Sequence, residues 1–410
     1  MIMQDNEKKP ALRFKGFTDP WEQRKLEEYL EVSGQKNFEG IYTKEDVLSV
    51  SGDFGIVNQI EFQGRSFAGA SVANYGVVET GDIVYTKSPL KSNPYGIIKA
   101  NKGKNGIVST LYAVYKPKQS ANPEFVQIYF EQDARMNNYM HPLVNKGAKN
   151  DMKVSAENAL KGQIVFPDIK EQRTISEFFR NLDTLITLHQ RKYEKLVNIK
   201  KSMLDKMFPK NGASVPEIRF KGFTDPWEQR KFGEVVDKYE DPVETPHDGY
   251  YRLGIRSHAK GTFHSYVEKG HELETAQMYR VAAGNFIVNI TFGWEHAVAI
   301  TNESDAGKLV SHRFPQYSFH DDMLPEFFKY VIADEDFRHW LWLASPGGAG
   351  RNRVLKLDEM LNYEMVLPSK EEQQRIAAIF RNLDTLITLH QRKLEKLQNI
   401  KKSCLEKMFV

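Results

Sequence analysis

Apolar side chains recur at alternating steps of four and three residues in two long stretches of the chain, 175–207 and 376–408. This heptad pattern predicts two long helices, each of which buries one apolar stripe against another helix. One histidine and one lysine interrupt the stripe in each stretch. The residues that we expect at the coiled-coil seam are Leu182, Ile186, Tyr193, Leu196, Met203, Leu383, Ile387, Leu394, Leu397 and Cys404.

Helix start signals stand before both stretches. Asp168 with Glu171, and Ser369 with Glu372, each follow a proline and have the spacing of a capping box. In such a box the cap side chain accepts a hydrogen bond from the first turn, and the glutamate returns to the backbone N–H of the cap residue. At about 1.5 Å per residue, each predicted helix is roughly 50 Å long.

The chain carries an internal duplication. Residues 13–25 and 219–231 both read RFKGFTDPWEQRK, so 13 of 13 positions are identical. Residues 180–208 and 381–409 are identical at 25 of 29 positions, whereas the segments between these repeats show no comparable similarity by eye. A period near 200 residues is too long for a solenoid repeat. We call the repeated segments 13–25 and 219–231 the frames, and the segments of about 26–165 and 232–366 that follow them the bodies. The sequence therefore predicts two units, and each consists of the same frame, a different body and the same helix.

The two predicted helices bury their stripes most simply against each other. A turn-rich linker, PKNGASVPEI at 209–218, leads from the first helix into the second frame. An antiparallel pair places each frame beside one helix end and gives pseudo-twofold symmetry. A parallel pair would crowd both bodies at one end of the helices. We therefore favour antiparallel pairing over parallel pairing.

The bodies combine short β-branched and aromatic runs, such as 76–86 and 281–291, with helical segments near 124–138 and 324–343. The predicted fold class is α+β (mixed α/β), with two globular domains separated by two long antiparallel coiled-coil helices. The expected boundaries are a tail at 1–12, a first globular domain at 13–166, a first helix at 167–208, a linker at 209–218, a second globular domain at 219–367 and a second helix at 368–410.

Composition narrows the class of protein. The 410 residues are 40% apolar and 27% charged, which supports folded cores and argues against general disorder. No apolar run of about 18 residues predicts a membrane span, and the first residues do not form a signal peptide. A single cysteine excludes a disulfide scaffold and fits the cytoplasm. The net charge of +3 allows nucleic-acid binding only through local basic patches.

Motifs that carry catalysis are missing from the sequence. It contains no P-loop, no G-x-G-x-x-G after a predicted strand and no H-E-x-x-H. Asn93-Pro94-Tyr95 resembles the motif of amino-methyltransferases but lacks its second proline, and we interpret it as a turn. We therefore expect no catalytic residue, no metal and no cofactor in this chain, which would bind and position rather than catalyse.

Basic, glycine-rich loops are the positive signal for function. Lysine and arginine contact phosphates, and arginine, lysine and asparagine also read base edges, although a basic loop can simply be solvated. Two such loops stand at matching places before the two helices, which favours DNA. The candidate DNA-binding residues are Lys87, Lys91, Asn93, Tyr95, Lys102, Lys104, Lys146, Lys149, Asn150, Arg256, His258, Lys260, Arg351, Asn352 and Arg353.

The layout resembles the DNA-specificity subunit of type I restriction–modification systems. The resemblance is carried by 167–208 and 368–409, which each run from a proline through Asn-Leu-Asp-Thr-Leu-Ile to a lysine-rich tail that ends in Lys-Met-Phe. The repeated frame and the glycine loops near Gly147 and Gly348 also match this family's layout. The likeness spans nearly the whole chain and is weakest inside the bodies.

The resemblance implies that each body is a target-recognition domain for half of a split, asymmetric site on double-stranded DNA. The helices would act as a spacer between narrowly separated half-sites, on the order of one DNA turn or about 34–36 Å apart. Two methyltransferase subunits would dock on the chain and bring S-adenosylmethionine. Restriction subunits that use ATP and Mg²⁺ could join them.

Two other classes of function stay open. A scaffold could bind proteins through its helical rod and its bodies without reading DNA, and it would show no salt-dependent DNA affinity. An unrecognised enzyme in one body would show turnover by the isolated chain.

Overall fold

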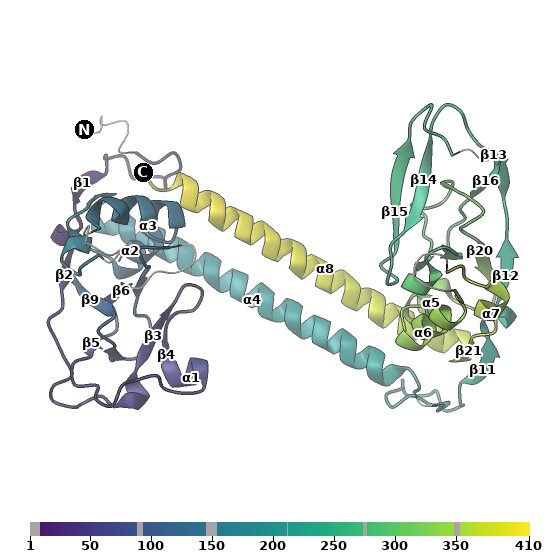
Figure 1. Cartoon of the computed structure of the whole chain (residues 1–410), viewed down its shortest axis with the longest axis horizontal. Helices are drawn as coiled ribbons and strands as arrows, with labels where there is room; N and C mark the ends of the chain where they lie inside the picture. Colours follow the sequence, from purple (N-terminus) through teal and green to yellow (C-terminus); the bar gives the residue numbers. More distant parts are fainter. Residues whose placement is uncertain (1–8, 88–92, 145–153, 211, 274–276, 348–352) are drawn as a thin grey trace. The chain divides into compact units, whose positions relative to one another are not determined.

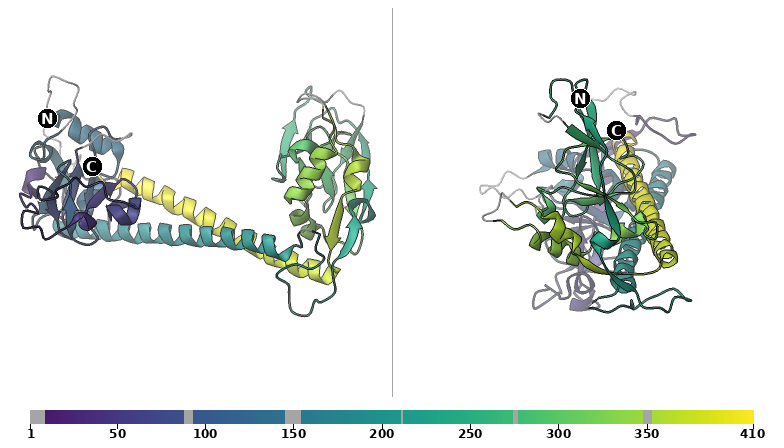
Figure 2. Two further views of the ribbon diagram at one scale, coloured as in Figure 1. Left: turned by 60° about the horizontal axis from the view of Figure 1, so that its bottom comes forward. Right: turned by 90° about the vertical axis from the view of Figure 1, so that its right-hand side faces the viewer.

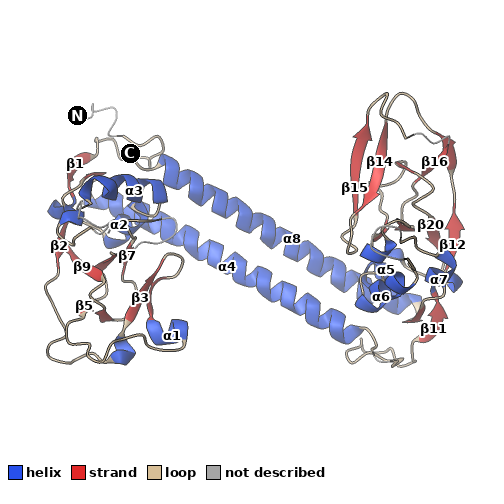
Figure 3. Ribbon diagram, in the orientation of Figure 1, coloured by secondary structure: helices blue, strands red, loops and turns tan. Residues whose placement is uncertain are grey.

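The computed structural model describes residues 9–87, 93–144, 154–210, 212–273, 277–347 and 353–410. They form two compact units: unit 1 consists of Met1–Arg191 and Gln391–Val410, and unit 2 consists of Lys192–His390. Both units mix helices and strands (Figure 3), which confirms the predicted fold class.

Two long helices, α4 (Ile169–Met207) and α8 (Lys370–Lys407), each begin in one unit and end in the other (Figure 1). In unit 1, Asp183 of α4 pairs with Lys401 of α8 at 2.9 Å. In unit 2, Lys200 of α4 pairs with Asp384 of α8 at 2.5 Å. The paired residue number rises on one helix as it falls on the other, so the helices run antiparallel as predicted (Figure 2).

The predicted seam is only partly buried. Leu182 and Cys404 are 6% and 8% exposed, and Cys404 belongs to the core cluster of unit 1. A helix that packs against one neighbour alone shields its stripe incompletely, so the remaining seam residues are half-buried. These are Ile186, Tyr193, Leu196, Met203, Leu383, Ile387, Leu394 and Leu397.

At the start of α4, only one half of the predicted capping box forms. Asp168 caps the helix, since its Oδ1 accepts hydrogen bonds from the backbone N–H groups of Lys170 and Glu171 at 2.7 and 2.9 Å. The carboxylate of Glu171 forms a bidentate ion pair with Arg13 instead of returning to the cap. Glu171 is 1% exposed, and a buried carboxylate is stabilised more by a guanidinium than by one N–H.

Unit 1 contains one four-stranded antiparallel sheet with the order β2-β9-β6-β7. A strand pair, β1 with β10, ties the frame to the strand that precedes α4. The strands of unit 1 are β1 (Glu22–Lys25), β2 (Leu30–Val32), β3 (Leu48–Ser51), β4 (Gly55–Asn58), β5 (Gly76–Val78), β6 (Ile83–Thr86), β7 (Ile98–Ala100), β8 (Gly106–Val108), β9 (Tyr112–Pro117) and β10 (Gln163–Phe166). Its shorter helices are η2 (Leu26–Glu28), η3 (Lys44–Asp46), α1 (Gln59–Gln63), α2 (Pro123–Tyr129), α3 (Asp133–Met140), η4 (His141–Leu143) and η5 (Asn158–Leu160).

Unit 2 contains a four-stranded antiparallel sheet, β12-β20-β17-β18, and a five-stranded sheet, β13-β16-β19-β14-β15. Its strands are β11 (Glu228–Lys231), β12 (Val236–Tyr239), β13 (Pro242–Glu244), β14 (Tyr250–Ile255), β15 (Thr262–Val267), β16 (Gln277–Arg280), β17 (Phe286–Val288), β18 (Val298–Ile300), β19 (Leu309–Val310), β20 (Gln316–Phe319) and β21 (Glu364–Leu367). Its shorter helices are η6 (Phe232–Glu234), η7 (Gly293–Glu295), α5 (Pro325–Val331), α6 (Glu335–Leu343) and α7 (Leu357–Leu361).

The two bodies share one scaffold despite their different sequences. Strands β2, β9, β6 and β7 of unit 1 have the order and antiparallel directions of β12, β20, β17 and β18 of unit 2. Helices α2 and α3 follow the sheet in unit 1 as α5 and α6 do in unit 2, and β11 pairs with β21 as β1 pairs with β10. The bodies differ in the additional strands, so the duplication extends to the architecture and diverges in what the scaffold carries.

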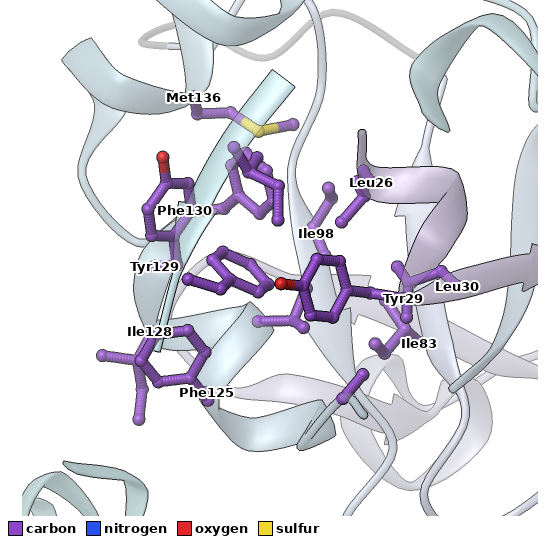
Figure 4. Packing of buried hydrophobic residues seen from close by; sticks show 14 of the residues in the cluster. Leu26, Tyr29, Leu30, Ile83, Ile98, Phe125, Ile128, Tyr129, Phe130 and Met136 are labelled. Atoms are coloured by element: carbon purple, nitrogen blue, oxygen red, sulfur yellow. The ribbon is translucent and has the colours of Figure 1, made fainter. Parts of the chain in front are cut away.

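Each body core is closed by the phenylalanine that follows a long helix. In unit 1, the centre of the Phe409 ring lies 5.7 Å from that of Phe125 and 6.1 Å from that of Trp21. These rings belong to the core cluster of unit 1, part of which is shown in Figure 4. In unit 2, Phe208 lies 6.0 Å from Trp227 and 5.5 Å from Phe327. Each body therefore packs around the end of one helix and the start of the other.

Candidate nucleic-acid interface

In unit 2, the turn between β14 and β15 presents the predicted residues Arg256, His258 and Lys260, which are all exposed. The backbone of this turn is fixed to η7. The N–H of His258 donates to the carbonyl of Glu295 at 3.0 Å, and the N–H of Ala259 donates to the carbonyl of His296 at 2.9 Å. The backbone of the turn is therefore tied to η7 and to the residue after it, while the guanidinium of Arg256 donates to the carbonyl of Thr262 and the side chains of His258 and Lys260 are exposed.

The segment that contains Arg353 flanks the same short helix. The N–H of Leu355 donates to the carbonyl of Ile290 at 2.9 Å, and a Cβ on Gly293 would lie 3.0 Å from the Leu355 side chain. The guanidinium of Arg353 lies 4.9 Å from the centre of the Trp342 ring, on α6. The structure thus brings the predicted turn at 256–260 and the described segment from Arg353 to Leu355 to one connection, the one between β17 and β18.

A hollow of about 450 Å³ borders this connection. Its lining combines the aromatic rings of Phe263, Phe292 and Phe314 with the polar groups of Asn289 and Glu295. The guanidinium of Arg256 lies 5.3 Å from the centre of the Phe263 ring at its rim. Because it is both apolar and polar, this surface suits the edge and methyl groups of a DNA base better than a bare phosphate.

In unit 1, the equivalent connection, between β6 and β7, carries Lys87, Asn93 and Tyr95. Lys87 is half-buried, and burial together with the nearby Lys36 ammonium lowers its pKa. Asn93 is 6% exposed, and its amide nitrogen donates to Asp133 at 2.7 Å. The ring of Tyr95 packs edge-on against His141 at 6.0 Å. Asn93 and Tyr95 thus both have contacts within the body, and the amide nitrogen of Asn93 is bonded to Asp133.

The other predicted lysines of that stretch, Lys102 and Lys104, lie at the opposite end of β7, in the turn that leads to β8. Both side chains are exposed, and Lys102 lies 3.9 Å from the carboxylate of Glu124. Residues that are close in sequence are therefore divided between two ends of one short strand. The remaining candidates, Lys91, Lys146, Lys149, Asn150, Arg351 and Asn352, lie outside the described residues.

Exposed aromatic side chains were not among the predicted site residues. In unit 2, Tyr251 and Tyr266 face each other across β14 and β15, are 59% and 55% exposed, and have ring centres 5.0 Å apart. In unit 1, Phe54 and Phe62 are 67% and 45% exposed. Large exposed apolar groups mark interaction surfaces. The only sign of these residues in the sequence was the aromatic content of the predicted strands. Aromatic residues are equally common in buried strands, so this content does not distinguish exposed side chains from buried ones.

Over the described ranges, no three His, Cys, Asp or Glu side chains gather in a way that could hold a metal ion. None of the helices in those ranges is both long and apolar enough to cross a membrane.

The described residues thus form two units that share one scaffold and the two long antiparallel helices, as a duplicated protein would. Residues 225–399 match the family model of the type I restriction modification DNA specificity domain. This match covers less than half of the chain, and it makes the chain similar to the specificity subunits of type I restriction–modification systems, as the repeated frame and helices predicted.

Two relatives from Methanocaldococcus jannaschii are similar in sequence. The chain is 23% identical to the type I restriction enzyme MjaVIII specificity subunit over 255 residues, which are 58% of this chain and 59% of that protein. It is 22% identical to a protein described as the MjaX specificity subunit over 418 residues, 94% of this chain and 91% of the relative. The S subunit of a type I system from M. genitalium has the same fold, with a TM-score of 0.56, 10% identity and coverage of 98% and 99% of the two chains.

Proposed function

We propose that the chain reads an asymmetric bipartite site on double-stranded DNA, one half with each unit, and positions adenine methyltransferase subunits on it. The observation that carries this proposal is one repeated scaffold with different side chains at the equivalent connection, β6–β7 in unit 1 and β17–β18 in unit 2. Two units with the same scaffold can bind DNA in the same way, and different exposed residues give each unit its own preference for DNA bases.

The spacing of the half-sites is the proposed task of α4 and α8. Each is one continuous helix, of 39 and 38 residues. The ion pairs between Lys401 and Asp183 and between Lys200 and Asp384 fix the register of one helix against the other. A helix pair with fixed register resists extension, and this supports a narrow, constant gap between the two half-sites.

The docking surface for the methyltransferase subunits is the exposed apolar side of both long helices. Leu185 and Leu188 of α4 are 45% and 45% exposed, and their repeats on α8, Leu386 and Leu389, are 42% and 44% exposed. The fold does not bury these side chains, yet they are identical in the two copies. Exposed apolar groups repeated in this way fit two copies of the same partner protein.

Catalysis would then belong to the partners. S-adenosylmethionine, and ATP and Mg²⁺ where restriction subunits join, would bind to those subunits, while this chain binds and orients the DNA. The lone cysteine, Cys404, agrees with work in the reducing cytoplasm.

Selection of random DNA duplexes by the assembled complex tests this function. We expect an asymmetric motif with two short defined halves and a gap of fixed length. We also expect an affinity that falls steeply with salt, because phosphate contacts release counterions. A protein scaffold without DNA readout would enrich no motif and show no such salt dependence, and that result would overturn the proposal.

A further inference from the structure

Backbone strain is concentrated at one point of unit 2. Among the described residues, the non-glycine residues with a positive φ are His258 at 62°, Ala259 at 49° and His296 at 61°. All three meet where the β14–β15 turn is bonded to η7, because Ala259 donates to the carbonyl of His296 itself. The left-handed region is unfavourable for an L-residue with a Cβ, and such a conformation persists only where surrounding contacts enforce it.

The β14–β15 turn could be built without this strain. Glycine or asparagine at positions 258 and 259 would adopt the same backbone at little cost, as Gly261 does two residues later with a φ of 82°. The sequence instead has an imidazole at 258, and two backbone hydrogen bonds to η7 hold its Cα in place. Strain that the contacts maintain beside a candidate binding surface indicates a side chain whose position matters.

The side chains around His258 suit a DNA groove. Arg256 and Lys260, two residues before and after it, are exposed cations. Such cations contact phosphates on either side of a groove. A two-stranded ribbon fits the major groove, which is about 12 Å wide, and there both purines present N7 as an acceptor. A neutral imidazole carries one N–H donor and one acceptor.

We propose that His258 is the base-contacting residue of unit 2 and reads a purine of its half-site through an imidazole N–H, with Arg256 and Lys260 on the flanking phosphates. The strained turn and its two hydrogen bonds to the η7 segment fix the backbone that carries this imidazole. This inference rests on the proposed function and names the residue that gives unit 2 its base preference.

Two substitutions in the full chain, assembled with its methyltransferase partners, separate readout from folding. His258→Ala removes the imidazole and keeps the Cβ and the strain, whereas Ala259→Gly relaxes the strain and removes no polar group. His271→Ala is the matched control, since His271 is exposed and follows the opposite end of the β14–β15 hairpin. The measurement is sequencing of methylated sites, with the preference for each base counted at every position.

With His258→Ala, we expect discrimination at one position of one half-site to fall by about 5- to 150-fold, and the other half-site to stay unchanged. We expect Ala259→Gly to weaken discrimination at the same position by a smaller factor without lowering the melting temperature. His271→Ala should leave the motif intact.

If the methylated motif is unchanged in His258→Ala, the inference about His258 is wrong and the proposed function is unaffected. Equal loss in both half-sites would also overturn the inference, because the substitution would then act on the fold. A wild-type complex that methylates no bipartite motif would overturn the proposed function and this inference with it.

Discussion

The ion pair between Arg13 and Glu171 gives the sharpest prediction about how a frame is held to a long helix. Two hydrogen bonds of 2.7 Å join the guanidinium to the carboxylate, and the side chains are 14% and 1% exposed. Glu171→Gln keeps the volume of the side chain but removes its charge. Arg13 then remains almost buried without a counter-charge.

Breaking a buried pair by removing one partner costs about 3–5 kcal/mol. Arg13 keeps some contact with water, so we expect the lower end, about 3 kcal/mol, for Glu171→Gln. The double substitution Arg13→Met with Glu171→Met removes both charges, and we expect it to cost less than Glu171→Gln alone. Arg13 and Glu171 are thus coupled, and their two single effects should not add.

Hydrogen exchange followed by mass spectrometry measures the effect for each unit separately, because body peptides of the two units differ in sequence. Glu171→Gln should lower the protection of slowly exchanging amides in β10 and α2 by about 150-fold and leave unit 2 unchanged. The matched control is Glu372→Gln, which breaks the equivalent pair with Arg219 (2.9 and 2.8 Å) and should act on unit 2 alone. A loss below about fivefold, or an equal loss in both units, would refute the coupling of frame to helix.

Three further predictions concern the helices and unit 2. Inserting one heptad into both α4 and α8 should lengthen the gap in the methylated motif, and an unchanged gap would argue against a spacer. Leu185→Asp combined with Leu386→Asp should reduce methyltransferase binding at least tenfold in a pull-down of purified subunits, whereas Thr187→Asp, at a more polar exposed position, should not. Burial lowers the pKa of His296 below its ordinary value of 6.5, against the opposing hydrogen bond to the carbonyl of Ile332. The folded state therefore resists protonation, and unit 2 should lose stability as the pH falls below about 6.5; His296→Asn, which also tolerates a positive φ, should flatten that loss in urea titrations at several pH values.

The elements predicted correctly from the sequence are those with a strong period or an internal copy. The heptad stripe from Leu182 to Met203 identified α4, and its repeat identified α8, because one face of a long helix must be apolar to pack. The antiparallel direction followed from where the linker 209–218 leads. The equivalence of the two bodies could not be predicted, since many apolar sequences fill the same sheet and helix scaffold.

Contacts over long sequence distances explain the other differences. Nothing near Glu171 in sequence indicates that Arg13, 158 positions earlier, takes its carboxylate away from the helix cap. Asn93 has the residue type of a base reader, but its amide is bonded to Asp133 in the body. Residue type predicts what a side chain can do, and tertiary packing decides which side chains stay available. The strain at His258 and Ala259 could likewise not be predicted, because these two positions lack the glycine that normally marks a positive φ.

A chimera with two copies of the first body tests the central claim that each body reads its own half-site. In this chimera, residues 26–162 replace residues 232–363. The two segments are bounded by equivalent strand partners, since Lys25 pairs with Gln163 in unit 1 as Lys231 pairs with Glu364 in unit 2. Methylation sequencing of the chimera in its complex should give an inverted repeat of one wild-type half-site, with the wild-type gap. A motif that keeps both original halves, or that has no relation to either, would contradict the account.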